Sequence, residues 1–132
     1  MAEFDKADIE KLIDGVLPWP ATQDMLKSSK DTNRFDKYVE IMQSRVDFSD
    51  PILLPLTPNL FIVSEGGNRV VKCRCGQGFG DYRVNWKISA LIRVRDDEAS
   101  ISEVYVGREM PDPKWMQIRE YICAGCGSQL DV

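Results

Sequence analysis

The sequence predicts an α+β fold, in which a helical N-terminal region is followed by a small antiparallel β portion and a short C-terminal helix. Two observations predict it. Before residue 48, apolar residues recur at the three- and four-residue spacing of helices. From residue 49 onward, short apolar runs are bounded by glycine and proline, as strands commonly are. The 132 residues suit one domain, with a helical part at 1–48 and a β-rich, metal-binding part at 49–132.

The first third predicts two amphipathic helices. The first has Asp5 as its N-cap, is ended by Pro18 and Pro20, and carries an apolar stripe made of Ile9, Leu12, Ile13, Val16 and Leu17. The second follows the polar residues 28–32, where Asp31 or Thr32 is the expected cap, and its stripe consists of Phe35, Tyr38, Val39, Met42 and Val46. Residues 24–27, between the two helices, fit one further helical turn.

The middle of the chain predicts extended structure. Three prolines in residues 51–58 exclude a regular helix or a central strand, so this apolar segment is either a strap across the domain's own core or a strip buried against another subunit. Residues 60–63 and 69–72 then flank a Gly-Gly-Asn tip that suits positive φ, which predicts a β-hairpin. Cys73 follows directly on its second strand.

The second half predicts more strand and one last helix. Alternation of apolar and polar residues over 82–90, continued at 91–95, predicts one or two strands, and residues 96–98 predict a turn. Residues 101–106 fit either a strand or a helix. Asp112 as N-cap and Pro113 at the first helical position predict a final helix, with Trp115, Ile118 and Ile122 on one side.

Charge and hydropathy limit the partners and the location. The formal net charge is −4, with 17 basic and 21 acidic side chains, whereas non-specific binding to nucleic acid needs an excess of Lys and Arg. No apolar run approaches the roughly 18 residues of a membrane span, and the N-terminal residues are acidic where a signal peptide is basic. We therefore expect a cytoplasmic protein that binds neither nucleic acid nor membrane. Disulfides are rare in that compartment.

The four cysteines form two short chelating turns. Cys73 and Cys75 form the first turn, Cys123 and Cys126 the second, and a glycine follows the second cysteine of each. Glycine lets the backbone curl so that N–H groups face sulfur, which stabilises a thiolate. Two such turns and no histidine in the chain predict a zinc-ribbon-like site in which all four cysteines hold one metal ion, most simply zinc.

The predicted site is structural. Catalytic zinc keeps an open position for water, whereas four thiolates fill the tetrahedron. The chain has no histidine and no recognisable nucleophile motif, so we expect no catalytic residues in it, and the acidic residues 96–98 are expected to form a solvated turn rather than an acid and base pair. Two alternatives remain open at this point: a rubredoxin-like iron electron carrier and a thiol–disulfide exchanger.

Several motifs together resemble the acetone carboxylase gamma subunit family, over residues 9–131. They occur in the family's order and spacing: RF with YVEI at 34–41, ILLPLTPNLFIV at 52–63, CRCG at 73–76 followed by Phe79 and Asp81, NWK at 85–87, and PKWMQIREYICAGCG at 113–127. A histidine often follows the first cysteine turn in this family and is absent here. The small subunits of the acetone enzymes carry a longer C-terminal tail than this sequence. In this respect the sequence looks more like the acetophenone carboxylase branch.

The resemblance implies a small, zinc-bearing structural subunit of an ATP-dependent, biotin-independent ketone carboxylase. Larger catalytic subunits would hold ATP, Mg or Mn, and the ketone, and an aryl ketone such as acetophenone is the preferred substrate of the complex, which implies a role in aromatic-compound degradation. The residues alone also fit a free-standing zinc-ribbon binding module.

Overall fold

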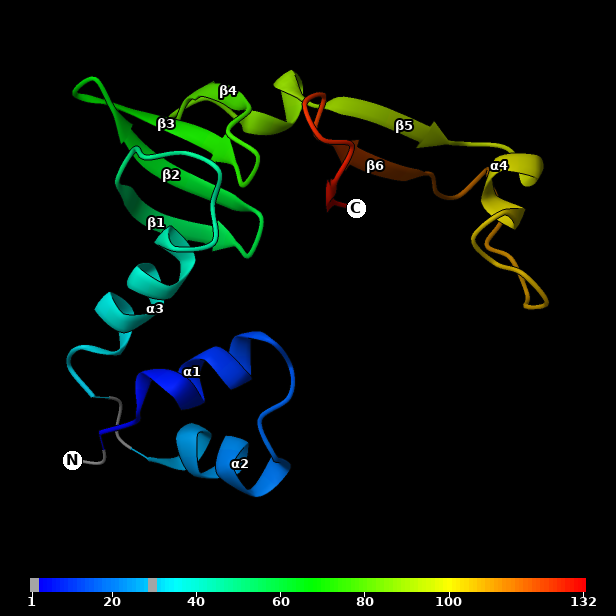
Figure 1. Ribbon diagram of the computed structural model, residues 1–132. Helices are drawn as coiled ribbons and strands as arrows, with labels where there is room; N and C mark the ends of the chain where they lie inside the picture. Colours follow the sequence, from blue (N-terminus) through cyan, green and yellow to red (C-terminus); the bar gives the residue numbers. More distant parts are fainter. Residues whose placement is uncertain (1–2, 29–30) are drawn as a thin grey trace.

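The computed structural model describes residues 3–28 and 31–132 and has an α+β fold with the helices first and most strands after them, as expected (Figure 1). The helices and strands occur in the order α1 (Lys6–Ile13), α2 (Trp19–Lys27), α3 (Arg34–Gln43), β1 (Ile52–Thr57), β2 (Leu60–Glu65), β3 (Asn68–Cys73), β4 (Gly78–Asp81), the 3₁₀ turn η1 (Trp86–Ser89), β5 (Leu91–Arg95), α4 (Glu98–Ser102), β6 (Ile118–Ile122) and β7 (Gln129–Asp131).

The strands form two separate antiparallel sheets. One sheet has the order β1-β2-β3-β4 and the other the order β5-β6-β7. Figure 1 shows an arch: the helices lie at one end, the four-stranded sheet lies at the bend, and β5 and β6 lead away from that sheet toward α4 at the other end. The polypeptide passes from the first sheet to the second through η1.

Three small cores lie in series along the chain. Helices α1, α2 and α3 enclose the first, which contains Ile9, Met25 and Ile41. The second lies between α3 and one face of the first sheet and contains Met42, Ile52, Phe61 and Val63. The third joins the two sheets and contains Leu60, Val71, Cys73, Phe79, Cys123 and Leu130. Two of the four cysteines are therefore core residues.

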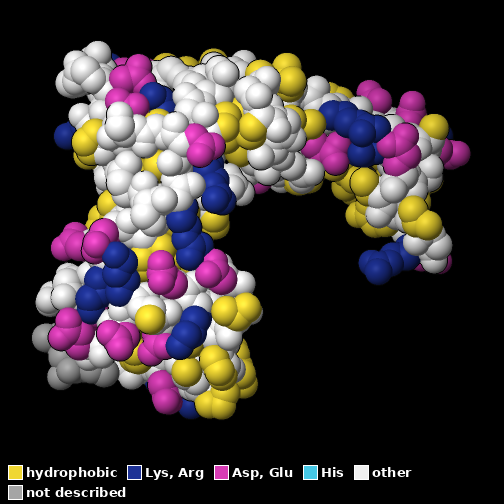
Figure 2. All heavy atoms as spheres, in the orientation of Figure 1, with side chains coloured by type: hydrophobic (Ala, Val, Ile, Leu, Met, Phe, Trp, Pro, Cys, Tyr) yellow, Lys and Arg dark blue, Asp and Glu magenta, His cyan; other side chains and the backbone are white. Residues whose placement is uncertain are grey.

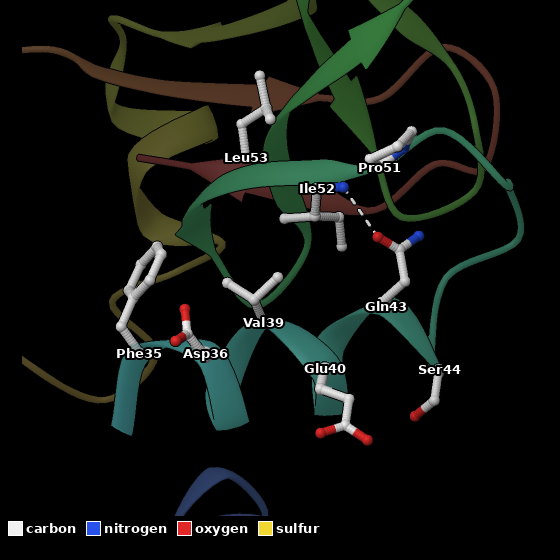
Figure 3. Close-up of a pocket in the computed structure, with 9 residues that line it drawn as sticks. All are labelled: Phe35, Asp36, Val39, Glu40, Gln43, Ser44, Pro51, Ile52 and Leu53. Carbon is white, nitrogen blue, oxygen red and sulfur yellow. Dashed lines mark hydrogen bonds between the residues drawn. The ribbon is translucent and has the colours of Figure 1, made fainter. Parts of the chain in front are cut away.

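The proline-rich segment 51–58 is extended, as expected, and contains the edge strand β1. Ile52 packs in the chain's own core, so this end of the segment acts as the expected strap. Gln43 of α3 fastens it there, because its Oε1 accepts a hydrogen bond from the Ile52 N–H at 2.8 Å and its Nε2 donates to the Asp50 carbonyl at 3.2 Å (Figure 3). Three leucines of the segment stay more than two fifths exposed: Leu53, Leu54 and Leu56.

The β2–β3 hairpin is confirmed, and Gly66 and Gly67 have the positive φ of its tip. The second predicted helix is also confirmed, as α3, but its N-cap is Asn33 rather than Asp31 or Thr32. Asp31 instead accepts a hydrogen bond from Arg34 Nε at 2.8 Å. Residues 29 and 30 of the expected polar N-terminal segment lie outside the described residues.

The expected first helix was too long. α1 ends at Ile13, and Val16 and Leu17 lie beyond it. Gly15, at φ +71°, forms a Schellman cap in which its N–H donates to the Leu12 carbonyl at 3.1 Å and the Val16 N–H donates to the Lys11 carbonyl at 2.9 Å. The prolines that were expected to end this helix lie at the start of α2, with Pro20 in its first turn.

The final helix predicted over 112–122 is wrong. Asp112 does start one turn, since its carbonyl accepts the Trp115 N–H at 2.9 Å and its side chain accepts the Lys114 N–H at 2.9 Å. The chain then becomes extended, and Ile118–Ile122 is β6, paired with β5 along its whole length. A long-range pairing that no local signal encodes overrides the helical spacing.

The strand predicted over 82–90 is also wrong, because this stretch contains η1. Asn85 explains it: its side chain accepts the Lys87 N–H at 3.1 Å, which closes a turn where the alternation predicted a strand. The strand at 91–95 is confirmed as β5. Asp97, expected in a solvated turn, caps α4, and the segment 101–106, left open between strand and helix, begins with the end of that helix.

Candidate metal centre

Two β-hairpins carry the four cysteines. Cys73 ends β3, and the turn containing Cys75 leads into β4; Cys123 follows β6, and the turn containing Cys126 leads to β7. The turns are closed in the same way: the Cys73 N–H donates to the Gln77 carbonyl at 2.9 Å, and the Cys123 N–H donates to the Ser128 carbonyl at 2.9 Å. Two similar turns, which we call knuckles, therefore approach each other from separate sheets.

The sequence-predicted residues come together in space. Cys73 Sγ lies 3.8 Å from Cys126 Sγ, Cys75 Sγ lies 3.7 Å from Cys123 Sγ, and all four sulfurs lie within 4.8 Å of one another. A metal with Zn–S bonds of about 2.3 Å at the centre of a tetrahedron requires S–S edges of about 3.8 Å, whereas a disulfide requires about 2.05 Å. The spacing fits a tetrahedral metal ion, and all four cysteines are free thiols.

Glycine conformation supports this geometry where the sequence predicted it. Gly76 has φ +96° and Gly127 has φ +76°, a region that L side chains rarely adopt. The Gly127 N–H donates to the Cys123 carbonyl at 2.9 Å, and the Gly76 N–H donates to the Cys73 carbonyl at 2.8 Å. Both knuckles thus curl back on their first cysteine.

The surroundings of the sulfurs differ in polarity. Burial raises the pKa of the Cys73 and Cys75 thiols. The Ser128 hydroxyl and backbone N–H, by contrast, lower the pKa of Cys126 to about 6. The Gly125 N–H also faces Cys123 Sγ, at 3.3 Å. Burial keeps a thiol protonated, whereas a bound cation stabilises the thiolate. Four sulfur ligands in this partly buried position therefore fit a metal centre.

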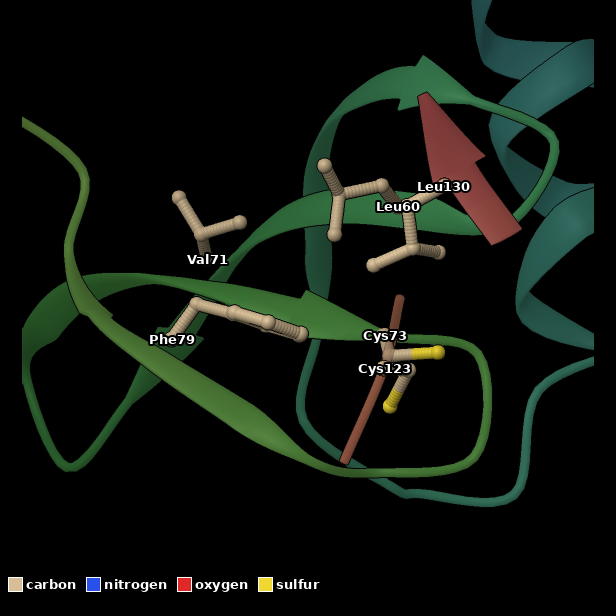
Figure 4. Packing of buried hydrophobic residues seen from close by; sticks show 6 residues of the cluster. All are labelled: Leu60, Val71, Cys73, Phe79, Cys123 and Leu130. Carbon is tan, nitrogen blue, oxygen red and sulfur yellow. The ribbon is translucent and has the colours of Figure 1, made fainter. Parts of the chain in front are cut away.

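Apolar side chains hold the two knuckles together from behind. Figure 4 shows Leu60, Val71, Phe79 and Leu130 around Cys73 and Cys123, both of which are fully buried. Cys126 lies on the exposed side. Trp86 of η1 extends this packing, since its ring meets Phe79 and Tyr121 edge-on at centroid distances of 5.8 Å and 6.1 Å. The cluster therefore lies at the joint between the two sheets.

Two neighbours of the cysteines were not predicted from the sequence. Ser128 contacts Cys126, with 3.2 Å between its Oγ and the sulfur. Gln77 lies against Gly125, where an added Cβ would meet the Gln77 Cβ at 3.0 Å. The position of Ser128, two residues after Cys126, is a local signal that was available. The contact between Gln77 and Gly125 joins two knuckles far apart in sequence and carries no such signal.

The described part of the chain also has hollows away from the cysteines. One is an open groove of about 680 Å³ between α3 and β1, lined by Phe35, Val39 and Leu53 among others (Figure 3). Across residues 3–28 and 31–132, the cysteine cluster is the group of side chains placed to hold a metal ion. Over the same residues, none of the helices has the length and apolar character needed to cross a bilayer.

Comparison with known proteins identifies the family. A family model described as acetone carboxylase gamma subunit matches residues 46–132, the part that holds both sheets and all four cysteines. A curated protein from Xanthobacter autotrophicus (strain ATCC BAA-1158 / Py2), named acetone carboxylase gamma subunit, is 41% identical over 131 residues, which cover 98% of this chain and 78% of that protein. This chain therefore belongs to the acetone carboxylase gamma subunit family.

Proposed function

We propose that this chain is a non-catalytic structural subunit of an ATP-dependent, biotin-independent ketone carboxylase, and that Cys73, Cys75, Cys123 and Cys126 hold one zinc ion. The observation that carries the proposal is the tetrahedral spacing of four sulfurs, with 3.7 Å and 3.8 Å between the two closest pairs, at the joint between two sheets. Membership of the gamma subunit family supplies the kind of assembly.

The proposed metal has a structural role. Four thiolates fill a tetrahedral zinc site and leave no position for substrate or water. When bound, zinc would supply the positive charge that keeps buried thiolates ionised, and Cys73 and Cys123 would join β3 to β6 through it. Zinc has no redox chemistry, which suits a structural site; iron would instead make the chain an electron carrier.

We place the chemistry on larger partner subunits. Those subunits would bind ATP with Mg or Mn, activate bicarbonate and carboxylate the ketone. The absence of histidine from this sequence supports that division, because histidine is the commonest general base. Four unpaired thiols fit a complex of the cytoplasm, where disulfides are rare.

The identity of the ketone is the finer part of the proposal. The absence of a histidine after the first cysteine turn departs from the pattern of the acetone enzymes, so we favour the acetophenone branch and an aryl ketone, with a role in aromatic-compound degradation, whereas the curated relative is named for acetone. An assay of the assembled complex with both ketones separates the two. Carboxylation and ATP hydrolysis that depend on acetophenone support the finer proposal, and activity with acetone alone contradicts it.

The experiment that tests the function is co-expression of this chain with the larger carboxylase subunits of its own organism. Native mass spectrometry is expected to show a complex that contains this chain, and elemental analysis is expected to find about one zinc per copy, as one four-thiolate site holds one ion. Isolation as a monomer beside assembled large subunits would refute the proposed function. A red colour with visible charge-transfer bands would show that the site holds iron rather than zinc.

A cysteine variant separates structure from catalysis. Cys126→Ser is expected to release most of the metal and to lower the yield of complex, because three remaining thiolates bind zinc much more weakly. The turnover of each complex that still forms is expected to stay unchanged. Val16→Ser, at an exposed position far from the cysteines along the chain, is the control and should change neither quantity. Loss of turnover with metal retained would give the site a catalytic role instead.

A further inference from the structure

The second sheet continues into a projection that packs against little of the rest of the chain. We define the β5–β6 arm as residues 91–122, which comprise β5, α4, the connection after α4, and β6. Figure 1 shows the arm leading away from the four-stranded sheet, with α4 at its far end. β7 pairs with β6 only near the cysteines, at Tyr121 and Ile122, so beyond these two residues β5 and β6 form a two-stranded ribbon that ends in α4 and the connection after it. Such ribbons are marginally stable in water unless another surface packs against them.

The arm exposes large apolar side chains. Trp115 is 88% exposed and Val106 is 80% exposed. Five more apolar residues of the arm are over two fifths exposed: Leu91, Ile92, Val94, Val104 and Met116. A monomeric protein rarely exposes this many large apolar side chains on one projection, and such surfaces mark sites of protein–protein interaction.

Three of the exposed residues lie in β5 and occupy both faces of the ribbon, whereas Val104, Val106, Trp115 and Met116 lie in the connection after α4. Leu91 and Ile92 are neighbours in β5, paired with Ile122 and Tyr121 of β6, so their side chains point to opposite faces. A flat partner would cover one face and leave the other in water. A surface that buries both must surround the arm, as a cleft does.

Four charged side chains of the arm form ion pairs with one another: Arg93, Arg95, Glu103 and Glu120. Arg95 is buried and donates hydrogen bonds to Glu103 at 2.8 Å and to Glu120 at 2.9 Å, while Arg93 donates to Glu103 at 2.6 Å. Figure 2 shows Lys, Arg, Asp and Glu side chains intermixed along the arm, with hydrophobic side chains beside them. The arm holds five Lys and Arg against seven Asp and Glu. This balance disfavours nucleic acid and anionic membranes and favours an apolar protein surface.

We propose that the β5–β6 arm inserts into an apolar cleft of a larger carboxylase subunit and that Trp115 is its main anchor. The proposal rests on the proposed function, which supplies the partner. Tryptophan is the residue type most enriched among the few that dominate binding energy. The arm is continuous with the metal centre, because Cys123 directly follows the last residue of β6. The metal would therefore fix the direction in which the arm leaves the rest of the chain.

Two exposed tryptophans provide a matched test. Trp115→Ser changes the arm, and Trp19→Ser changes α2, where Trp19 is 64% exposed. Metal content and melting temperature of both variants are measured first, and Val106→Ser replaces Trp115→Ser if that chain does not fold. The affinity of each metal-loaded chain for the co-expressed large subunits is then measured by biolayer interferometry. Trp115→Ser is expected to raise Kd at least tenfold, as loss of a dominant anchor does, and Trp19→Ser to leave it unchanged.

The possible outcomes distinguish failure of the arm proposal from failure of the proposed function. If the unaltered chain does not bind the large subunits, the proposed function fails. If it binds and the arm variants bind equally well, the arm proposal is overturned while the proposed function stands. If the isolated chain dimerises and Trp115→Ser abolishes the dimer, a second copy occupies the arm, which also overturns the proposal.

Discussion

At the scale of single residues, three glycines near the cysteines constrain the backbone in different ways. Gly127 has a positive φ, and a Cβ added there would meet no atom within 4 Å. Gly125 has an ordinary φ, but an added Cβ would meet Gln77 Cβ at 3.0 Å and Cys75 Sγ at 3.3 Å. Gly78 has neither constraint. Alanine at position 127 therefore tests backbone strain, and alanine at position 125 tests the close approach of the two knuckles. Alanine at position 78 tests neither and is the control.

We expect different defects from the two constrained glycines. Gly127→Ala should destabilise the chain by about 1 kcal/mol with metal retained, because only left-handed backbone strain is added. Gly125→Ala should lower metal affinity roughly tenfold, because it pushes the first knuckle away from the second. Gly78→Ala should do neither. Thermal melting and competition with a chromogenic chelator measure the two quantities. Equal metal loss in all three variants would contradict this assignment.

Asp31 is a buried carboxylate between two cations in the helical part. It accepts hydrogen bonds from Arg34 Nε at 2.8 Å and from Lys37 Nζ at 3.3 Å. Burial raises its pKa, but the bonds from Arg34 and Lys37 outweigh burial, so the pKa of Asp31 lies below its ordinary value. The folded state therefore favours the ionised form of this side chain.

This shift predicts how stability depends on pH. A carboxylate with a lowered folded pKa contributes stability above its unfolded pKa of about 3.9, and the contribution is lost as pH falls through the lower folded pKa. Asp31→Asn is thus expected to lower the melting temperature near neutral pH and to converge with the unaltered chain as pH falls below the lowered folded pKa of Asp31. Asp24→Asn, at an exposed position, is the control. A deficit that is the same at every pH would show that packing, not charge, is responsible.

At the scale of elements, the sequence predicts best what local contacts decide. α3 has a clear apolar stripe, and the β2–β3 hairpin has a Gly-Gly tip with positive φ, so both were found. The knuckles were found for the same reason, because cysteine spacing and the following glycine are local features. That Cys73 and Cys126 lie 3.8 Å apart follows from the pairing of distant strands, and the sequence indicated it only through the chemistry of thiolates.

The wrong predictions concern segments whose structure the local sequence does not decide. β6 carries Ile118 and Ile122 at a spacing that suits one helix face, and its pairing with β5, more than 20 residues away along the chain, decides its conformation. Pro18 and Pro20 predict the end of the first helix, although proline is also common in the first turn of a helix. Such signals mark a boundary without saying on which side the helix lies.

α4 supports an element-level prediction, because it rests on one buried side chain. Ile101 is fully buried, and Asp97 and Ser100 form a capping box ahead of it. Ile101→Ala should weaken the packing of α4 by about 3 kcal/mol and Ile101→Val by about 1 kcal/mol. Hydrogen exchange of the α4 amides measures this, with roughly hundredfold faster exchange expected for alanine. Equal exchange in the two variants would mean that α4 does not depend on this side chain.

At the scale of the whole molecule, the three cores differ in their dependence on the metal. The core of α1 to α3 and the core beneath β1 and β2 contain no cysteine. The third core contains Cys73 and Cys123 and joins the second sheet to the first. Besides this core, the sheets are linked by η1 and by an ion pair between Lys87 Nζ and Asp131 at 2.6 Å. An exposed ion pair of this kind adds at most about 1 kcal/mol.

Removal of the metal should therefore release the second sheet while the helices persist. Without a cation, four thiols face one another and the two knuckles lose the bond between them. Hydrogen exchange is expected to accelerate in residues 118–131 and to stay unchanged in α1 and α3 after treatment with a strong chelator. The fluorescence of Trp86, packed against Phe79 and Tyr121, should shift to longer wavelength, and added zinc should reverse both changes. Faster exchange in α1 and α3 as well would instead show that the metal holds the entire chain in one cooperative unit.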